Sequence, residues 1–262
     1  MGFKIGWFST GRDEQASVLL EDTCKAIEER RVENLAISFV FCNRERGEGK
    51  ESDEFIDLVN RKGIPLILLS SKKFRPDLRK KALKEKNESL LENWRILYDR
   101  EIMKRIKRYP FRIIFLAGYM LILGPEFCRN YPVFNLHPAA PGGPRGTWQE
   151  VIWQLIEKKA KNTGLMIHRV TPELDSGPAI TFCLFSIRGK RFDPLWDSFE
   201  KKLKKQGIEA IKAKEGENEP LFAAIREEQK KREFPLIIST LNLLSQGEIN
   251  PGKITSPRRI EL

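Results

Sequence analysis

Three polar side chains in the middle of the sequence have the types needed for acyl-group chemistry: Asn135, His137 and Asp175. Asn135 and His137 lie two residues apart in the segment 133–137, which reads as a short buried strand. Because side chains alternate along a strand, both project from the same face. An amide and an imidazole side by side could hold a carbonyl oxygen and transfer a proton. The competing interpretation is a core histidine satisfied by the backbone.

Asp175 lies in a tight turn and has no apolar surface to cover. A carboxylate close to His137 would favour the protonated imidazole. Pro138 favours an extended conformation at His137 and ends the strand there. In an open α/β sheet, ligands bind in a crevice at such carboxyl ends. An ordinary turn-forming role for Asp175 is the alternative.

The elements that must position these residues alternate along the chain. Helical apolar spacing separates short apolar, β-branched runs, which is typical of a parallel sheet covered on both faces. We therefore predict an α/β fold, a Rossmann-like, mostly parallel sheet with helices on both faces. The predicted strands are 4–8, 35–42, 65–69, 112–118 and 133–137. The predicted helices between and after them include 18–27, 54–60, 94–106 and 148–159.

The pattern changes after residue 160. Segments 164–170 and 180–187 suit a hairpin-like addition, and 221–244 reads as a helix interrupted near Pro235. Two charge-dense stretches, 72–88 and 190–215, look like insertions. We expect an α/β domain at residues 1–189 and a lysine-rich insertion at 190–215. C-terminal helices that pack on the same domain are expected at 216–249, and a tail at 250–262.

Composition restricts the classes of function. No apolar run approaches the roughly 20 residues that span a bilayer, and the start lacks signal-peptide features, so we expect no membrane and a cytoplasmic location. Scattered cysteines favour reduced thiols over disulfides or structural zinc; they are Cys24, Cys42, Cys128 and Cys183. The 47 basic and 36 acidic residues give a net charge of +11. Because both signs are abundant, a solvated surface is favoured over a nucleic-acid partner, which stays open.

Three motifs in order resemble the folate-dependent formyltransferase family, and most of all its glycinamide ribonucleotide (phosphoribosylglycinamide) branch. They are LAGYMLILGPEF at 116–127, FNLHP at 134–138 and HRVTPELDSGP at 168–178. The resemblance runs from about residue 4 to about residue 250. It implies the formyltransferase fold, with 10-formyltetrahydrofolate as co-substrate and no metal.

The resemblance also implies roles, position by position. The matching catalytic residues are Asn135, His137 and Asp175. The matching donor-binding residues are Arg95, Met120, Leu121, Ile122, Leu123 and Asn135. The matching substrate-binding loop contains Gly11, Arg12 and Asp13. His168 matches a family histidine outside the catalytic set, for which we expect a structural role. This chain departs from the family at Leu121, where an arginine is common, and in its loop STGRD at 9–13, which is poorer in Gly, Ser and Asn.

The expected acceptor is a small phosphorylated amine, glycinamide ribonucleotide first among them. An amino sugar nucleotide and the aminoacyl end of a tRNA are alternatives. Water is disfavoured as the acceptor because no regulatory domain precedes the first strand. A binding protein that keeps the fold without turnover is a further alternative, favoured by the altered loop and opposed by the intact Asn, His and Asp. A homodimer is possible.

Overall fold

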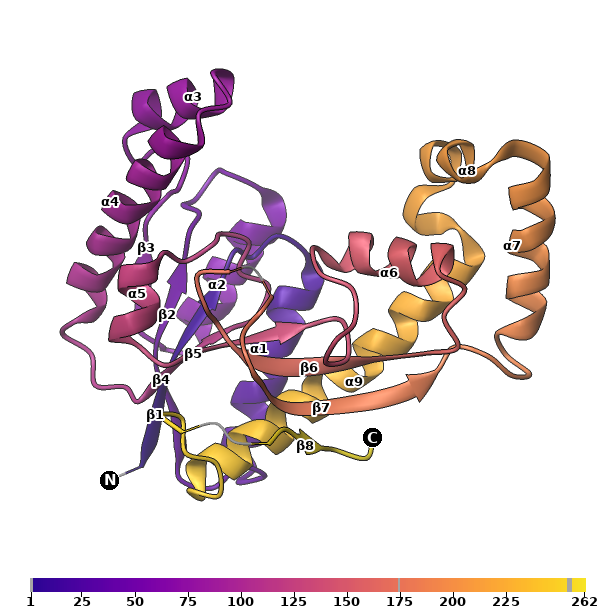
Figure 1. Ribbon diagram of the computed structural model, residues 1–262. Helices are drawn as coiled ribbons and strands as arrows, with labels where there is room; N and C mark the ends of the chain where they lie inside the picture. Colours follow the sequence, from indigo (N-terminus) through magenta and orange to yellow (C-terminus); the bar gives the residue numbers. More distant parts are fainter. Residues whose placement is uncertain (1, 174, 254–255) are drawn as a thin grey trace.

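One eight-stranded sheet organises the molecule (Figure 1), in the strand order β3-β2-β1-β4-β5-β6-β7-β8. The computed structural model describes residues 2–173, 175–253 and 256–262. Leu174 of the predicted turn, residues 254–255 of the predicted tail, and Met1 lie outside the described residues.

Five strands form the parallel part of the sheet: β1 (Phe3–Ser9), β2 (Leu35–Cys42), β3 (Leu66–Leu68), β4 (Ile113–Leu116) and β5 (Val133–His137). Strand β6 (Asn162–Arg169) pairs antiparallel with β5, and β7 (Ala179–Ser186) pairs antiparallel with β6. The short β8 (Arg258–Arg259) then adds in parallel to β7. The predicted mostly parallel α/β sheet is confirmed, with β6 the strand that runs against the others.

Helices cover both faces, as predicted. On one face, α1 (Glu14–Glu28), α2 (Lys50–Arg61) and α9 (Pro220–Ser245) contribute to one hydrophobic cluster; on the other, α4 (Glu88–Ile106) and α5 (Pro125–Asn130) contribute to a second. Neighbouring residues of β1 divide between them: Trp7 packs in the first cluster and Phe8 in the second. This alternation explains why the central strands are apolar throughout.

The two predicted insertions are helical. Residues 72–88 contain α3 (Pro76–Lys84), and residues 190–215 contain α7 (Asp193–Gln206) and α8 (Ile208–Lys214), which precede the 3-10 turn η1 (Gly216–Asn218). The second segment is weakly apolar in sequence, yet several of its apolar side chains are buried, among them Trp196, Phe199 and Ile211. They form a third cluster with α6 (Trp148–Glu157) and the start of α9.

The predicted interruption near Pro235 is wrong. Helix α9 runs from Pro220 to Ser245 with Pro235 inside it. A proline removes one helical hydrogen bond and crowds the preceding turn. Here Ile225 before it and Leu236 and Ile237 after it are all fully buried, so packing on both sides of Pro235 holds the helix continuous. The predicted C-terminal helices are thus one long helix after η1.

Candidate active site

A cleft of about 340 Å³ opens at the carboxyl ends of the parallel strands. It is bounded by the start of α1, the loop after β4, the end of β5, the start of α6, and α9. Eight residues selected from the sequence line it: Arg12, Asp13, Met120, Leu121, Ile122, Asn135, His137 and Asp175. The expected crevice at the strand ends is therefore present, and the three candidate catalytic residues meet in it.

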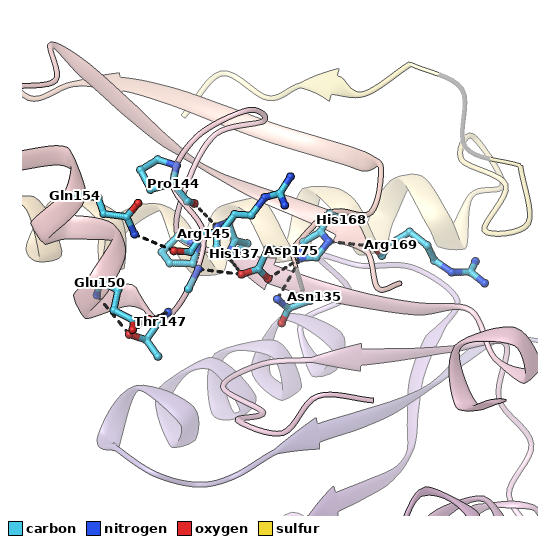
Figure 2. Close-up of polar contacts among 12 residues, drawn as sticks. Asn135, His137, Pro144, Arg145, Thr147, Glu150, Gln154, His168, Arg169 and Asp175 are labelled. Carbon is cyan, nitrogen blue, oxygen red and sulfur yellow. Dashed lines mark hydrogen bonds and ion pairs between the residues drawn. The ribbon is translucent and has the colours of Figure 1, made fainter. Parts of the chain in front are cut away.

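His137 is held from two sides (Figure 2). Its Nε2 lies 2.9 Å from the carbonyl oxygen of Pro144, so Nε2 carries a proton and donates. Its Nδ1 lies 3.5 Å from Oδ2 of Asp175. That separation is longer than an ordinary N–H···O hydrogen bond of about 2.7–3.2 Å. The carboxylate thus faces Nδ1 without a close hydrogen bond to it, which leaves Nδ1 accessible to another oxygen.

Asp175 takes a backbone conformation that brings its carboxylate inward. Its φ is 49°, in the left-handed region that aspartate tolerates better than most residues. Oδ2 accepts a hydrogen bond of 3.1 Å from the backbone N–H of Gly146. The side chain is 7% exposed. Asp175 is therefore a fixed carboxylate between two loops of the site as well as a turn residue.

Asn135 is oriented by His168. Nδ1 of His168 lies 3.0 Å from the carbonyl oxygen of Arg169, which can only accept, so Nδ1 carries the proton. Nε2 then accepts, over 3.2 Å, from Nδ2 of Asn135. Burial lowers the pKa of His168, His137 lowers it further and Asp175 opposes the shift. A neutral His168 therefore fixes which end of the Asn135 amide donates to it.

The sequence assigned His168 only a structural role, but its ring belongs to the same group of side chains. Its Nε2 lies 3.7 Å from Oδ1 of Asp175, and its ring meets that of His137 edge-on at 5.9 Å. The pairing of β5 with β6 places His168 directly opposite Asn135. Strand pairing of this kind, absent from the local sequence pattern, is what brings the histidine to the site.

The segment after β4 supplies an apolar wall. Met120 and Ile122 are each 40% exposed, and Leu121 is half-buried beside them. The N–H of Met120 donates to Oγ1 of Thr10, which anchors the segment to the loop after β1. Leu123 behaves differently: it is buried in the second hydrophobic cluster and is not among the described cleft-lining residues.

Two other residues selected from the sequence also lie outside the described lining. Arg95 is on α4, and it acts electrostatically on Asp99. Gly11 has φ +56°, and a Cβ added there would meet Phe55 at 3.0 Å, so the glycine allows the loop to pass close to α2. Asp13 lines the cleft but also caps α1, because its Oδ1 accepts from the N–H of Ala16.

Sequence reasoning missed the wall formed by α9. Arg226 and Glu233 form an ion pair of 2.5 Å within the cleft, and Gln15 donates to Glu233 over 2.8 Å. The guanidinium of Arg226 also covers the ring of Trp148, 4.6 Å from its centroid. The helical pattern of α9 shows no sign of this role, since Arg226 and Glu233 lie at the two ends of a charge-dense run, REEQKKRE.

Among the described residues, no group of three or more His, Cys, Asp or Glu side chains is placed to hold a metal ion. No helix in the described part of the chain is long and apolar enough to cross a membrane. The four cysteines are free and buried, and burial raises the pKa of each thiol.

Comparison with known proteins decides the family. Residues 14–188 match the Formyl transferase family. The chain belongs to that family. This formyl transferase is 38% identical to a phosphoribosylglycinamide formyltransferase of Dictyostelium discoideum over 100 residues, 34% of this chain and 48% of the relative. It is 31% identical to a formyltetrahydrofolate deformylase of Haemophilus influenzae over 134 residues, 49% of this chain and 39% of the relative. The matched region spans about half or less of these curated relatives.

Solved structures share the fold over nearly the whole chain. A phosphoribosylglycinamide formyltransferase of Coxiella burnetii superposes with a TM-score of 0.67 at 18% identity, over 99% of this chain and 100% of its own. A glycinamide ribonucleotide transformylase of Symbiobacterium toebii superposes with a TM-score of 0.65 at 15% identity, over 98% of this chain and 92% of its own. The formyltransferase fold that the motifs predicted is thereby confirmed for this formyl transferase.

Proposed function

We propose that this formyl transferase moves the formyl group of 10-formyltetrahydrofolate onto an amine. The observation that carries the proposal is the meeting of Asn135, His137 and Asp175 in one cleft, beside the apolar wall of residues 120–122. The family match supports the reaction type. Of the two curated relatives described above, one is a phosphoribosylglycinamide formyltransferase and the other a formyltetrahydrofolate deformylase.

The site provides what the transfer needs. The amine nitrogen bonds to the formyl carbon, negative charge develops on the formyl oxygen, and the bond from that carbon to N10 of the folate breaks. The second N–H of the Asn135 amide, which His168 does not accept, and the Nδ1 proton of His137 stabilise that oxygen; a donor of this kind contributes about 3–4 kcal/mol. The negative charge of Asp175 stabilises the positive charge that His137 carries in the transition state, and a water beside the carboxylate carries the proton lost by the amine to N10.

The donor would lie on the exposed part of residues 120–122. Met120 and Ile122 offer apolar side chains, and the backbone of this segment offers hydrogen-bonding groups for the edge of a pterin. Leu121 is compatible with such a slot because backbone groups, rather than its side chain, would read the ring. Leu123 supports the slot from the core, since it is buried behind it. Arg95 on α4 remains a proposed donor-binding residue, at the end of the folate farthest from the pterin.

Glycinamide ribonucleotide is the proposed acceptor because of the motifs and because three of the similar proteins are phosphoribosylglycinamide formyltransferases. Arg12 at the start of α1 supplies a cation for a phosphate, with Gly11 shaping the loop and the helix N-terminus adding positive potential. Asp13 bonds to the helix end and would compete with that phosphate. For this reason an amino sugar nucleotide and an aminoacyl-tRNA remain alternative acceptors, and Arg226 and Glu233 offer charged groups for any of them.

An assay of donor-dependent tetrahydrofolate release tests the proposal. Purified protein and 10-formyltetrahydrofolate are combined with each of three amines (glycinamide ribonucleotide, an amino sugar nucleotide and an aminoacyl-tRNA) and with buffer alone. Release with the first amine alone supports the assignment. Release with another amine keeps the formyl transfer and replaces the acceptor. Release in buffer alone indicates a deformylase, and folate binding without release in any arm indicates a binding protein.

A further inference from the structure

Three segments meet at the α7 end of the molecule, away from α3 (Figure 1). They are the end of α6, the open end of the β6–β7 pair and the last turns of α7, at residues 157–162, 186–191 and 200–205. The backbone N–H of Ile187 donates to the carbonyl oxygen of Lys161 and joins the first two segments. Nζ of Lys159 lies 2.9 Å from Oε1 of Glu200 and joins the first segment to the third. The three segments therefore form one continuous surface.

This surface carries a large excess of positive charge. Its three segments contain ten basic side chains but only two acidic ones, Glu157 and Glu200. Glu157 already pairs with a lysine of α8, and Glu200 pairs with Lys159. Two further cations, Arg191 and Lys202, pair with glutamates outside the three segments. Seven cations therefore remain without an ion pair in the described part of the chain.

Five of these seven cations lie beside the pair of Lys159 and Glu200, and we refer to them as the basic patch: Lys158, Lys161, Arg188, Lys190 and Lys204. Lys158 and Lys161 flank Lys159 in the sequence, and Lys190 follows Arg188 in the same loop. Lys204 follows Glu200 by one helical turn, so both lie on the same face of α7. Helical geometry turns the remaining two cations, Lys201 and Lys205, to another side of α7.

Two contacts fix the middle of the basic patch. The guanidinium carbon of Arg188 lies 3.9 Å from the ring centroid of Trp196, and Nη2 of Arg188 donates to the carbonyl oxygen of Lys159 over 3.1 Å. The hydrogen bond from Lys159 lowers the pKa of Glu200. The nearby charges of Lys204 and Arg188 lower this pKa further. Glu200 is therefore ionised at neutral pH, and it can neutralise only one of the cations around it.

We propose that the basic patch binds the phosphate backbone of a nucleic acid, without regard to its base sequence. Lysines suit phosphates because each ammonium is a point charge on a flexible stem, which needs no fixed geometry. A chain of phosphates meets several of these cations at once and releases the counterions that it carried, which drives binding.

This inference does not depend on the proposed formyl transfer, because the basic patch and the catalytic cleft lie at opposite ends of α6. Trp148, the first residue of α6, lines the cleft, whereas Lys158 follows its last turn. The ten residues of the helix span about 15 Å. A nucleic acid on the patch therefore leaves the cleft free.

Two features favour a nucleic acid over other polyanions. Six large apolar side chains are exposed among the described residues, and none of them lies in the three segments. The surface therefore offers no apolar group to insert into a lipid bilayer. An acidic peptide would need a groove beside the charges. The hollow between α6 and α7 has a volume of only about 180 Å³, and the carboxylates of Glu157 and Glu200 line it.

Fluorescence anisotropy of a labelled single-stranded RNA of about 20 nucleotides tests the proposal. The affinity of the wild-type protein should fall about 50-fold between about 50 and 200 mM salt, as about four phosphate contacts require. The triple variant Lys158→Gln/Lys161→Gln/Lys190→Gln should bind about tenfold more weakly at the lower salt concentration and lose most of the salt dependence. The variant Lys158→Arg/Lys161→Arg/Lys190→Arg keeps the charges and should bind as the wild type does. Single-stranded DNA of the same sequence should bind equally well.

The matched control removes three exposed lysines from α3, at the other end of the molecule: Lys80→Gln/Lys81→Gln/Lys84→Gln. It changes the net charge of the protein by the same amount, so it separates the basic patch from the effect of net charge. The control should retain both the affinity and the salt dependence of the wild type. Thermal melts of both Gln variants should match that of the wild type, because the substituted lysines are exposed and unpaired.

Each other result decides against the proposal. RNA that does not bind to the wild-type protein overturns it, as does binding that is independent of salt, even if the triple Gln variant does not fold. An equal loss of affinity in the α3 control shows that net charge alone attracts the RNA. Displacement of the RNA by poly-L-glutamate as effectively as by unlabelled RNA, at equal charge concentration, assigns the basic patch to an acidic protein instead.

Discussion

Oδ2 of Asp175 lies 3.5 Å from Nδ1 of His137, while Nε2 of the same ring donates to the carbonyl oxygen of Pro144. Both ring nitrogens therefore face oxygens. A ring that carries a proton on each nitrogen is the form that can stabilise an oxyanion, and the negative charge of Asp175 attracts that form. Two separate sequence motifs, one with His137 and one with Asp175, thus contribute to a single site. The contribution of the Asp175 charge can be tested by a substitution that removes the charge and keeps the size of the side chain.

Asp175→Asn should lower kcat by about 100-fold, because the neutral amide no longer favours the charged ring in the transition state. The affinity for a folate analogue should change little, since Asp175 acts on the reacting atoms. Steady-state kinetics and calorimetry measure the two quantities. Glu173→Gln, which removes one exposed carboxylate from the same turn, is the control and should keep its kcat. Loss of folate affinity equal to the loss of kcat would contradict the assignment.

His168→Leu should lower kcat about tenfold, because the Asn135 amide loses the acceptor that orients it, and tenfold in rate corresponds to about 1.4 kcal/mol. His168→Gln keeps an acceptor and should recover most of the rate. Since burial lowers the pKa of His168, this residue should limit activity only below its ordinary pKa of about 6.5. A Gln variant as impaired as the Leu variant would show that His168 acts by packing alone.

Asp99→Asn should change how stability depends on pH. Burial raises the pKa of Asp99 to about 7, whereas an unfolded aspartate titrates near 3.9. The folded state therefore binds the proton more strongly, and stability falls as pH rises from about 4 to about 7. The variant should have a Tm higher than the wild type by about 2–4 °C at pH 8, the shift that about 1 kcal/mol produces in a chain of similar size.

At pH 4 the difference in Tm between Asp99→Asn and the wild type should vanish, because Asp99 is then protonated in both states. Thermal melts at the two pH values provide the comparison. Asp77→Asn, an exposed carboxyl on α3, should shift neither melt. A variant less stable than the wild type at pH 8 would show that the ionised carboxylate, which accepts from the N–H of Gly124, holds that group more strongly than burial opposes the charge.

Arg12→Ala should raise the KM for a phosphorylated acceptor about tenfold and leave folate affinity nearly unchanged, because Arg12 lies at the α1 end of the cleft. Lys25→Ala, an exposed cation in the last turn of α1, serves as the control. Initial rates at varied acceptor concentration give the KM. An unchanged KM would remove Arg12 from the acceptor site and favour an acceptor recognised by Arg226 and Glu233.

Local patterns were enough to predict the class of the sheet and the placement of Asn135 and His137 on one face. Both predictions depend only on residues that are neighbours in the sequence, namely the alternation along β5 and the end of that strand. The role of His168 was not predictable in this way, since it depends on the antiparallel pairing of β6 with β5. The family motif located Asp175, but its contact with Gly146 could not be read from spacing. Contacts between distant segments account for both differences.

Helices rich in charged residues were also hard to interpret from the sequence, because their buried side could not be identified. Trp196 and Phe199 of α7 are buried, but the lysine-rich run 201–205 that follows them obscures the apolar stripe. Arg226 and Glu233 of α9 meet each other and Gln15 in the cleft, where charged residues on a helix would ordinarily face solvent. In both helices the partner surface, which the sequence does not specify, determines which side of the helix is buried.

The antiparallel addition of β6 has a consequence for the order in which the protein can become active. Asn135 and His137 end the last of the five parallel strands, but the side chains that orient them, His168 and Asp175, arrive with β6 and the turn after it. A nascent chain could therefore form its parallel half and still lack a working site. Competence for the proposed formyl transfer should appear only when β6 docks, a late step that closes contacts between segments more than 30 residues apart.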